Sequence, residues 1–336
     1  MPTSPLVFGD VGGANLSVIE HFRIASADGP DSDIQDPIRS ESNSPATNFL
    51  MRNMHLYWPR DQVLTFWFGS DRVVMDQCLF GPTLASMSSR GPLIGNNSQR
   101  VLFYRCLLAG CDQRNPLTQH SEMQVINCEI NGWDNEPTTF LQAGARGSVV
   151  NCRIKSGPQS DPTTRGEILC WDTDPNSVHV TGTIGTLQPD PDGDQRLMLS
   201  RVVGGAYIPD PTNQQGSFST TYVGENPGVV VADATSLDTL YSTVGPKPNN
   251  RDSKAAAIIA DCQAGTMQQD SSGPVSSLPT LAGGPSNIDN SREDKIGANL
   301  RSAIGMPDSA NGLVDTPNNS PWPWFFHAAQ AAAMQS

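Results

Sequence analysis

Four segments of the chain repeat one pattern, in which apolar and polar residues alternate over a strand length and a cysteine stands at a fixed place. The segments are RVVMDQCLF (72–80), RVLFYRCLL (100–108), MQVINCEI (123–130) and GSVVNCRI (147–154). Two earlier segments, LSVIEHFRI (16–24) and TNFLMRNMHL (47–56), carry Phe22 and Met54 at that place. The equivalent positions are 22, 54, 78, 106, 128 and 152, so the steps are 32, 24, 28, 22 and 24 residues. A period in the low twenties, lengthened where loops are inserted, predicts a solenoid of stacked coils.

Equivalent residues of such a solenoid form columns, because the strands of successive coils lie about 4.8 Å apart. We therefore expect Cys78, Cys106, Cys128 and Cys152 to form one row that points into the core. A metal or redox site is the alternative, but the chain has no C-x-x-C pair and free cysteine is among the most buried residue types. We interpret the row as a ladder of reduced, apolar thiols in a parallel β-helix.

The composition of the chain limits the classes of partner that it can bind. Charged residues make up only 16% of the 336 residues, and the 30 Gly and 27 Pro are typical of a loop-rich all-β chain. The net charge of −13 argues against nucleic acid as a partner, because phosphate binding needs a basic surface. No apolar run approaches the roughly 18 to 20 residues that span a bilayer, and no secretory signal is visible at the N-terminus.

Several motifs resemble those of the pectate lyase family of right-handed parallel β-helix proteins, and they occur in the family's order over roughly residues 17 to 270. LMRNMHL followed by YWPRDQ resembles the family's strand and Trp-x-x-Asp-Glu segment. RGPLIGNNSQRVLFYRCLLAGCDQRNP resembles its Leu-Ile-Gly, strand and Arg-x-Pro stretch, and VINCEINGWD resembles the strand that follows. LYSTVGPKPNNRDSKAAAIIADCQAGT (240–266) resembles the segment after the last coil. The resemblance implies an all-β, right-handed parallel β-helix with an irregular C-terminal segment packed along it.

The resemblance also implies a reaction and a set of residues. The family cleaves uronate-containing polysaccharides by β-elimination, and the arginine of its Arg-x-Pro loop, which is the base, matches Arg114. Arg90 falls where the family has a substrate-binding lysine. Gln119 falls where a second arginine is expected. Because arginine is normally protonated, it can act as a base only where burial or neighbouring cations disfavour its charge.

The residues at the expected metal-binding positions differ from those of the family. The resemblance implies Ca²⁺ as the cofactor, and Asp61 matches one of its acidic ligands. Gln62 and Phe66 stand where further acidic ligands are expected, although calcium needs 6 to 8 oxygen ligands. We predict at most a weak calcium site, with Asp61 as its one acidic ligand.

The repeat indicates parallel β-helix coils over 1–205, and the resemblance implies a family-like segment after the last coil over 206–270. Composition indicates a Gly/Ser/Pro-rich surface segment over 271–336 that ends in aromatic residues. The first coil is expected near residue 17, where it would leave a strand edge open. The aromatic residues Trp322, Trp324, Phe325 and Phe326 need a surface to cover them. We therefore expect a homo-oligomer or an assembly partner at the N-terminal coil or at the aromatic C-terminus.

Two functions follow. The first is a pectate-lyase-like enzyme that acts on an acidic polysaccharide. The alternative is a non-catalytic structural or glycan-binding β-helix of a virion or surface assembly, with a degenerate lyase site. Either function places the protein outside the cell or on a virion.

Overall fold

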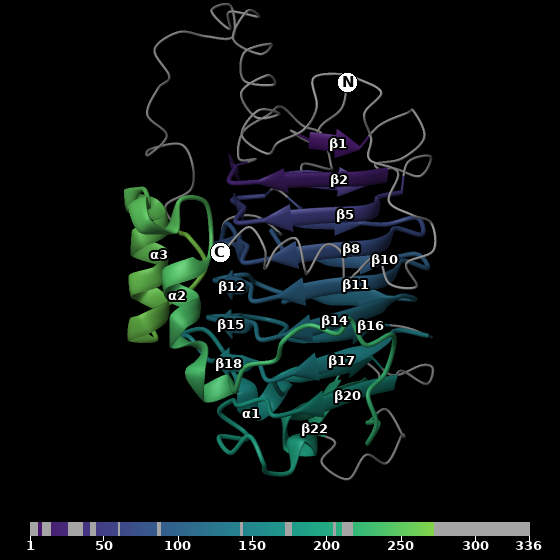
Figure 1. Cartoon of the computed structure of the whole chain (residues 1–336). Coiled ribbons are helices and arrows are strands. Elements are labelled where there is room, and N and C mark those ends of the chain that lie inside the picture. The colour runs from purple at the N-terminus through teal and green to yellow at the C-terminus, as the bar shows by residue number, and fades with distance from the viewer. Residues whose placement is uncertain are drawn as a thin grey trace, which may run out of the picture.

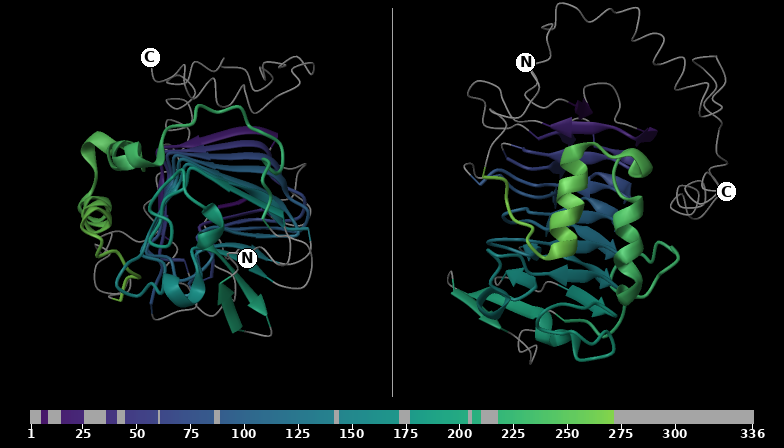
Figure 2. Two further views of the ribbon diagram at one scale, coloured as in Figure 1. Left: turned by 90° about the horizontal axis from the view of Figure 1, so that it is seen from below. Right: turned by 90° about the vertical axis from the view of Figure 1, so that its left-hand side faces the viewer.

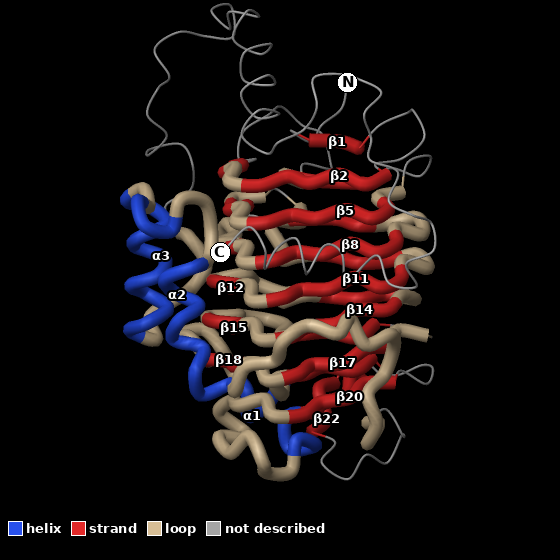
Figure 3. Tube along the Cα trace, viewed as in Figure 1, coloured by secondary structure: helices blue, strands red, loops and turns tan. Residues whose placement is uncertain are grey.

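The computed structural model describes residues 6–8, 15–25, 36–40, 45–59, 61–85, 89–141, 144–171, 177–203, 206–209 and 218–271. Its strands stack as the rungs of a solenoid (Figures 1 and 3). Within the described residues, sheet A is formed by β1 (Leu6–Phe8), β4 (Ile38–Ser40), β7 (Leu64–Phe66), β10 (Leu93–Gly95), β13 (Leu117–Gln119), β16 (Thr138–Leu141), β19 (Ile168–Trp171), β21 (Leu199–Val203) and β22 (Ala206–Pro209).

The other two sheets supply the remaining sides of the solenoid. Sheet B is formed by β2 (Asn15–Glu20), β5 (Thr47–Arg52), β8 (Asp71–Asp76), β11 (Gln99–Tyr104), β14 (Glu122–Ile126), β17 (Arg146–Val150) and β20 (Ser177–Thr181). Sheet C is formed by β3 (Arg23–Ala25), β6 (His55–Tyr57), β9 (Leu79–Phe80), β12 (Leu107–Ala109), β15 (Glu129–Asn131) and β18 (Arg153–Lys155).

Each complete coil contributes one strand to each sheet, and the strands of successive coils pair in parallel. The end-on view in Figure 2 shows the three sheets around one interior. Only the last pair of sheet A, β21 with β22, is antiparallel among the described strands. The structure confirms the predicted parallel β-helix.

The cysteine row lies inside, as the repeat predicts. Cys78, Cys106, Cys128 and Cys152 are fully buried and unpaired. Each thiol contacts two backbone carbonyls, one of its own coil and one of the coil before: Cys128 Sγ lies 3.4 Å from Ile126 O and 3.4 Å from Phe103 O. Thr183 takes the next place in the row, and its hydroxyl contacts Thr181 O and Val149 O in the same way. The row is therefore a set of small side chains that satisfy carbonyls at one corner of each coil.

The residue before each member of this row turns the corner in the left-handed backbone region, where Asn is favoured over most residues. Asn127 has φ 51° and Asn151 has φ 47°. Their amides also contact the C-terminal segment. Asn127 Nδ2 donates to Ala232 O at 2.6 Å, its Oδ1 accepts from Ala232 N at 2.8 Å, and Asn151 Nδ2 donates to Ala232 O at 2.9 Å. The asparagines thereby hold the C-terminal segment on the outside of the corner.

The C-terminal segment packs along two sides of the solenoid, as expected, but much of it is helical (Figure 2). Its helices cover sheet C through an apolar cluster that joins Leu79, Leu107 and Ala109 to Leu240, Ile258 and Cys262. The helical elements of the described chain are α1 (Pro162–Arg165), η1 (Gln195–Met198), η2 (Ala234–Thr239), α2 (Leu240–Thr243), η3 (Pro248–Asn250) and α3 (Ser253–Ala264). Asp252 caps α3 at its start, and Gly265 ends it with φ 71°.

The structure describes the N-terminal end of the solenoid but not the C-terminal tail of the chain. Strand β1 pairs with β4, so the stack of sheet A extends to Leu6–Phe8 and does not start near residue 17. Val18 and Phe22, on the first coil, are 42% and 44% exposed. The tail containing Trp322 to Phe326 lies outside the described residues. No helix in the described part of the chain is long and apolar enough to cross a membrane.

The buried thiols give a direct test of the stack. All seven cysteines of the chain are buried and free, so a soluble thiol-exchange reagent should label none of them in the native protein and all of them in denaturant. The physical reason is that attack needs an exposed thiolate, and burial raises the pKa of Cys111 and Cys262. Rapid labelling of one or more thiols without denaturant would contradict the inward row.

Candidate functional site

The residues that precede the strands of sheet A form a column across successive coils. Gln62 pairs with Arg90 in a parallel bridge, and Leu93 pairs with Leu117, which pairs with Thr139. In the loops before these strands, Gly91 N donates to Gln113 O at 2.8 Å and Glu136 N donates to Asp112 O at 3.2 Å, so Arg90, Arg114 and Glu136 lie on consecutive coils within about one residue of the same height. Asp36 completes the series, since its Oδ1 accepts from Gln62 N at 2.8 Å. We call Asp36, Gln62, Arg90, Arg114 and Glu136 the charged column.

The loop around Arg114 is fixed by its neighbours above and below. Arg114 has φ 65°, which is uncommon for a long side chain and is held here by tertiary contacts. Asn115 is buried; its amide donates to Cys111 O at 3.3 Å and Glu136 O at 2.9 Å, and its carbonyl accepts from Thr138 Oγ1 at 2.7 Å. On the other side, Gly91 N donates to Gln113 O at 2.8 Å. The backbone of Arg114 is thus clamped between two coils.

The side chain of Arg114 is half-buried and makes no hydrogen bond or ion pair within the described residues. Its Nε is buried without a partner. Burial lowers the pKa of Arg114, and the neighbouring Arg90 lowers this pKa further, whereas Asp61, Glu136 and Asp36 act in the opposite direction. A half-buried guanidinium without a hydrogen-bond partner can donate to an anion.

Arg90 and Asp61 form an ion pair of 3.0 Å beside Arg114. The structure therefore brings together Arg114, Arg90 and Asp61, the residues that the sequence selects on different coils. Gln119 is different: it ends β13, where it pairs with Gly95 and Leu141, and so lies at the far end of the strand from the charged column. The roles of all four residues remain predictions.

The groups around Asp61 do not fit a calcium ion. Asp61 Oδ1 already accepts from the Arg90 guanidinium and from Gln62 Nε2. Gln62 Oε1 accepts from Thr65 Oγ1 at 3.2 Å, and Phe66 is buried in the core. Asp36 Oδ2 lacks a partner, but Asp36 is fully buried and burial raises its pKa to about 6. A cation next to the carboxylate and an inaccessible second carboxyl leave too few oxygens for a hard divalent ion.

Glu136 was not selected from the sequence, and the structure places it one coil beyond Arg114. Its backbone is fixed because Asp112 O accepts from the amides of Asp134, Asn135 and Glu136 at 3.1, 2.7 and 3.2 Å. Burial raises the pKa of Glu136, and Arg114 lowers it. A Glu two residues before a strand carries no signal by itself, so only the register of the coils reveals this neighbour.

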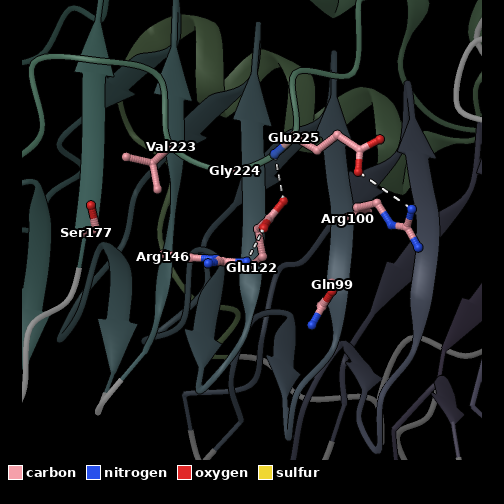
Figure 4. A pocket seen from close by; sticks show the side chains of 8 residues that line it. All are labelled: Gln99, Arg100, Glu122, Arg146, Ser177, Val223, Gly224 and Glu225. Carbon is pink, nitrogen blue, oxygen red and sulfur yellow. Dashed lines mark hydrogen bonds and ion pairs between the residues drawn. The ribbon is translucent and has the colours of Figure 1, made fainter. Parts of the chain in front are cut away.

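A second polar site lies on the outside of sheet B, where a pocket of about 560 Å³ opens between the strand starts and the C-terminal segment (Figure 4). Its charged residues pair with one another: Arg146 with Glu122 at 3.0 Å, and Arg100 with Glu225 at 3.6 Å. Glu225 N also donates to Glu122 Oε1 at 3.0 Å. These contacts hold the C-terminal segment to sheet B, and they explain why charged residues line the pocket.

Comparison with known proteins gives a weak likeness among solved structures. No protein family model matches the chain. No curated protein matches it either. Among solved structures, a pectate lyase from Bacillus sp. N165, crystallised with trigalacturonate, is similar to the chain at 14% identity, with a TM-score of 0.38, over 70% of this chain and 78% of the other. The fold described above rests on the strand pairing of the chain itself.

The contact between the two arginine coils can be tested at Gly91. A Cβ at this position would lie 2.0 Å from Arg114 O, so Gly91→Ala must push the two coils apart. We expect a loss of about 1–3 kcal/mol in the free energy of unfolding, measured in urea, which is the usual cost of overpacking. Gln113→Ala, at a half-exposed position next to Arg114 on the facing coil, serves as the control and should cost less. Equal stability of Gly91→Ala and the wild type would contradict the stacking of Arg90 on Arg114.

Proposed function

We propose that the protein is a pectate-lyase-like β-helix that binds an acidic, uronate-containing polysaccharide at the charged column and cleaves it by β-elimination. The observation that carries the proposal is the pair of Arg90 and Arg114 on adjacent coils, with Arg114 half-buried and unpaired within the described residues. The chain has a net charge of −13 and Asp61, Glu136 and Asp36 lie near these arginines, but none of them forms an ion pair with Arg114 within the described residues, so its guanidinium can donate to an anionic ligand. The carboxylate of a uronate supplies the matching charge and geometry.

The chemistry of elimination makes demands that the site can meet. A proton must leave the carbon next to the carboxylate, and the negative charge that develops there must be stabilised. Two guanidinium groups can stabilise this charge, and the resemblance assigns the proton transfer to Arg114. The pKa of Arg114 is lowered, which is the direction that a role as base requires.

The alternative function is binding without cleavage, in a structural protein of a virion or surface assembly. The ion pair between Asp61 and Arg90 favours this alternative, because it occupies the one carboxylate that the resemblance assigns to calcium. The same column would then hold an acidic glycan through Arg90 and Arg114. Both functions share the ligand class and differ only in whether product forms.

Replacing Arg114 separates the two functions. Wild-type protein incubated with polygalacturonate, alginate or another acidic glycan should release unsaturated uronates, which absorb in the ultraviolet. Arg114→Ala should abolish this signal while binding, measured by calorimetry or affinity electrophoresis, weakens but stays measurable. Arg196→Ala is the control, because this exposed arginine pairs only with its neighbour Asp194 among the described residues. Binding by the wild type without any unsaturated product would establish the non-catalytic function.

The proposed association of chains is tested by shortening the aromatic tail. We expect that deletion of residues 320–336 weakens self-association or lowers solubility, because Trp322, Trp324, Phe325 and Phe326 would each contribute roughly 1.5–3 kcal/mol if buried in a contact. Light scattering of the full chain and of the shortened chain gives the two molar masses. A full chain that is monomeric at all concentrations would end this part of the proposal.

A further inference from the structure

We infer that the indole of Trp67 is a platform on which one sugar ring of the bound polysaccharide stacks, in a subsite on the outer face of sheet A beside the charged column. This inference rests on the proposed function, because it takes the ligand to be a polysaccharide, and it adds an apolar contact to the charged ones. It follows from the position of the indole over a glycine of the next coil.

Trp67 directly follows β7, whose residues alternate between the two faces of sheet A. Leu64 and Phe66 belong to the buried core cluster, so Thr65 and Trp67 are directed to the outer face. The side chain of Trp67 is half-buried, and its backbone is fixed by the previous coil, since Trp67 N donates to Ser40 Oγ at 2.8 Å. A fixed backbone therefore presents the indole on the outside of the solenoid.

The ring of Trp67 lies flat over Gly95 of the next coil. The register of β7 and β10 pairs Phe66 with Ile94, so Gly95 is the neighbour of Trp67. A Cβ on Gly95 would lie 1.8, 2.1 and 2.5 Å from Cζ3, Cε3 and Cη2 of the indole. Such similar distances to three adjacent ring atoms place this Cβ against the face of the ring and not against its edge. One face of the indole thus covers the glycine, and the other face is directed away from the sheet.

Phe68 supports the indole from the side. The centroids of the two rings are 6.4 Å apart and their planes are inclined by 80°, which is the edge-to-face arrangement that aromatic pairs favour. With Gly95 below it and Phe68 beside it, the indole has little rotamer freedom left to lose. The platform is therefore preorganised, and a ligand that stacks on it orders few side chains.

A flat, outward-facing indole matches the shape and chemistry of a sugar ring. One face of a pyranose carries mainly C–H groups, whereas the hydroxyl and carboxylate groups project from the edge of the ring. The face of an indole is apolar and carries the negative part of the ring quadrupole, so it attracts these C–H groups, and both surfaces leave water. The ligand class is thus a sugar unit of a polysaccharide, whose carboxylates stay available to arginines.

A chain of polar contacts connects the platform to the charged column along the same face. Thr65 Oγ1, two residues before Trp67, donates to Gln62 Oε1 at 3.2 Å. Gln62 Nε2 in turn donates to Asp61, which pairs with Arg90 at 3.0 Å. Trp67 lies five residues after Gln62, which corresponds to roughly 16 Å along a strand. A polysaccharide with one carboxylate at Arg90 therefore reaches Trp67 with a different sugar unit.

Gln119 lies in the same column of sheet A as the platform. Gly95 pairs with Gln119 in β13, so the column runs from Trp67 through Gly95 to Gln119. The side chain of Gln119 is half-buried, and its amide can donate to and accept from the hydroxyl groups of a sugar that covers Trp67. The substrate-binding role predicted for Gln119 fits this second column better than the charged column.

The experiment measures the binding of galacturonate and alginate oligomers of increasing length to the wild type, Trp67→Ala, Trp67→Phe and Gly95→Ala by calorimetry. Gly95→Ala adds only a methyl group under the ring, and this group must lift the indole from the sheet. Phe22→Ala is the control, because this exposed aromatic residue lies between β2 and β3, at the corner of sheets B and C. Thermal unfolding of each variant separates a loss of fold from a loss of binding, and Trp67→Phe serves if Trp67→Ala does not fold.

We expect the affinity of the wild type to rise with oligomer length and this rise to be lost in Trp67→Ala and Gly95→Ala, which should bind long oligomers about 10-fold more weakly. Short oligomers that fill only the charged column should bind equally to the wild type and to these variants. Trp67→Phe keeps an aromatic ring and should lose less affinity, and Phe22→Ala should match the wild type. Long oligomers should change the tryptophan fluorescence of the wild type more than that of Trp67→Phe.

Two different results would overturn the inference, and they can be told apart. If Trp67→Ala and Gly95→Ala bind long acidic oligomers as tightly as the wild type but unfold at lower temperature, the indole only covers Gly95, and the proposed function stands. If the wild type binds no acidic oligomer of any length, the proposed function is wrong and the platform falls with it.

Discussion

Backbone hydrogen bonds between successive coils are the constraint on which the rest of this structure depends. They fix the register of the coils, so residues at equal positions become neighbours at about 4.8 Å whatever the length of the loops between them. Inside the solenoid this produces the row from Cys78 to Thr183. Outside, it forces Arg90 against Arg114 and Glu136 against Arg114. The two arginines repel each other, and the guanidinium of Arg114 forms no ion pair within the described residues, so it can bind an anion.

The outer faces of the coils are covered by polar as well as apolar contacts. Glu129, on sheet C, is fully buried and accepts from Asn131, Arg153 and the hydroxyl of Tyr241 at 2.6 to 2.7 Å. A buried carboxylate with all of these partners is tolerated, and removal of one partner would leave a costly unpaired group. Because Tyr241 belongs to α2, this network fixes the C-terminal segment at one place along the stack. A rigid stack in turn keeps the charged column in register.

The two polar sites differ in whether their charges are satisfied. In the pocket on sheet B, Arg100, Glu122, Arg146 and Glu225 neutralise one another and bind the C-terminal segment. In the charged column, Arg114 lacks any such partner among the described residues, and the carboxylate of Glu136 is equally free of hydrogen bonds there. Unsatisfied, half-buried charge is costly for a fold and is found where a ligand completes the site. Because of this difference, we propose that the ligand binds at the charged column and not in the pocket on sheet B, whatever the size of that pocket.

The sequence by itself determined the parallel β-helix and its inward row, because a period near 24 residues and an alternating pattern allow few other packings. It also selected Arg114, Arg90 and Asp61, through motifs that stand in order along the chain. Thr183 escaped prediction because the last step is 31 residues and the side chain is not a thiol, although its hydroxyl meets the same carbonyls. The resemblance implies an irregular C-terminal segment, whereas the structure has helix α3 there, which its Asp cap and Ala-rich sequence favour.

Only the tertiary structure decided which charges meet. Loop lengths between coils vary, so a sequence shows that Glu136 exists but not that it lies one rung from Arg114; the pairing of Leu117 with Thr139 shows this. The same holds for Asp36, which reaches Gln62 through the register of β4 and β7. The ion pair of Asp61 with Arg90 also joins two successive coils, so the sequence alone does not show it. Pattern and propensity fix a fold through many weak repeated signals, whereas a site depends on a few distances that only the folded chain sets.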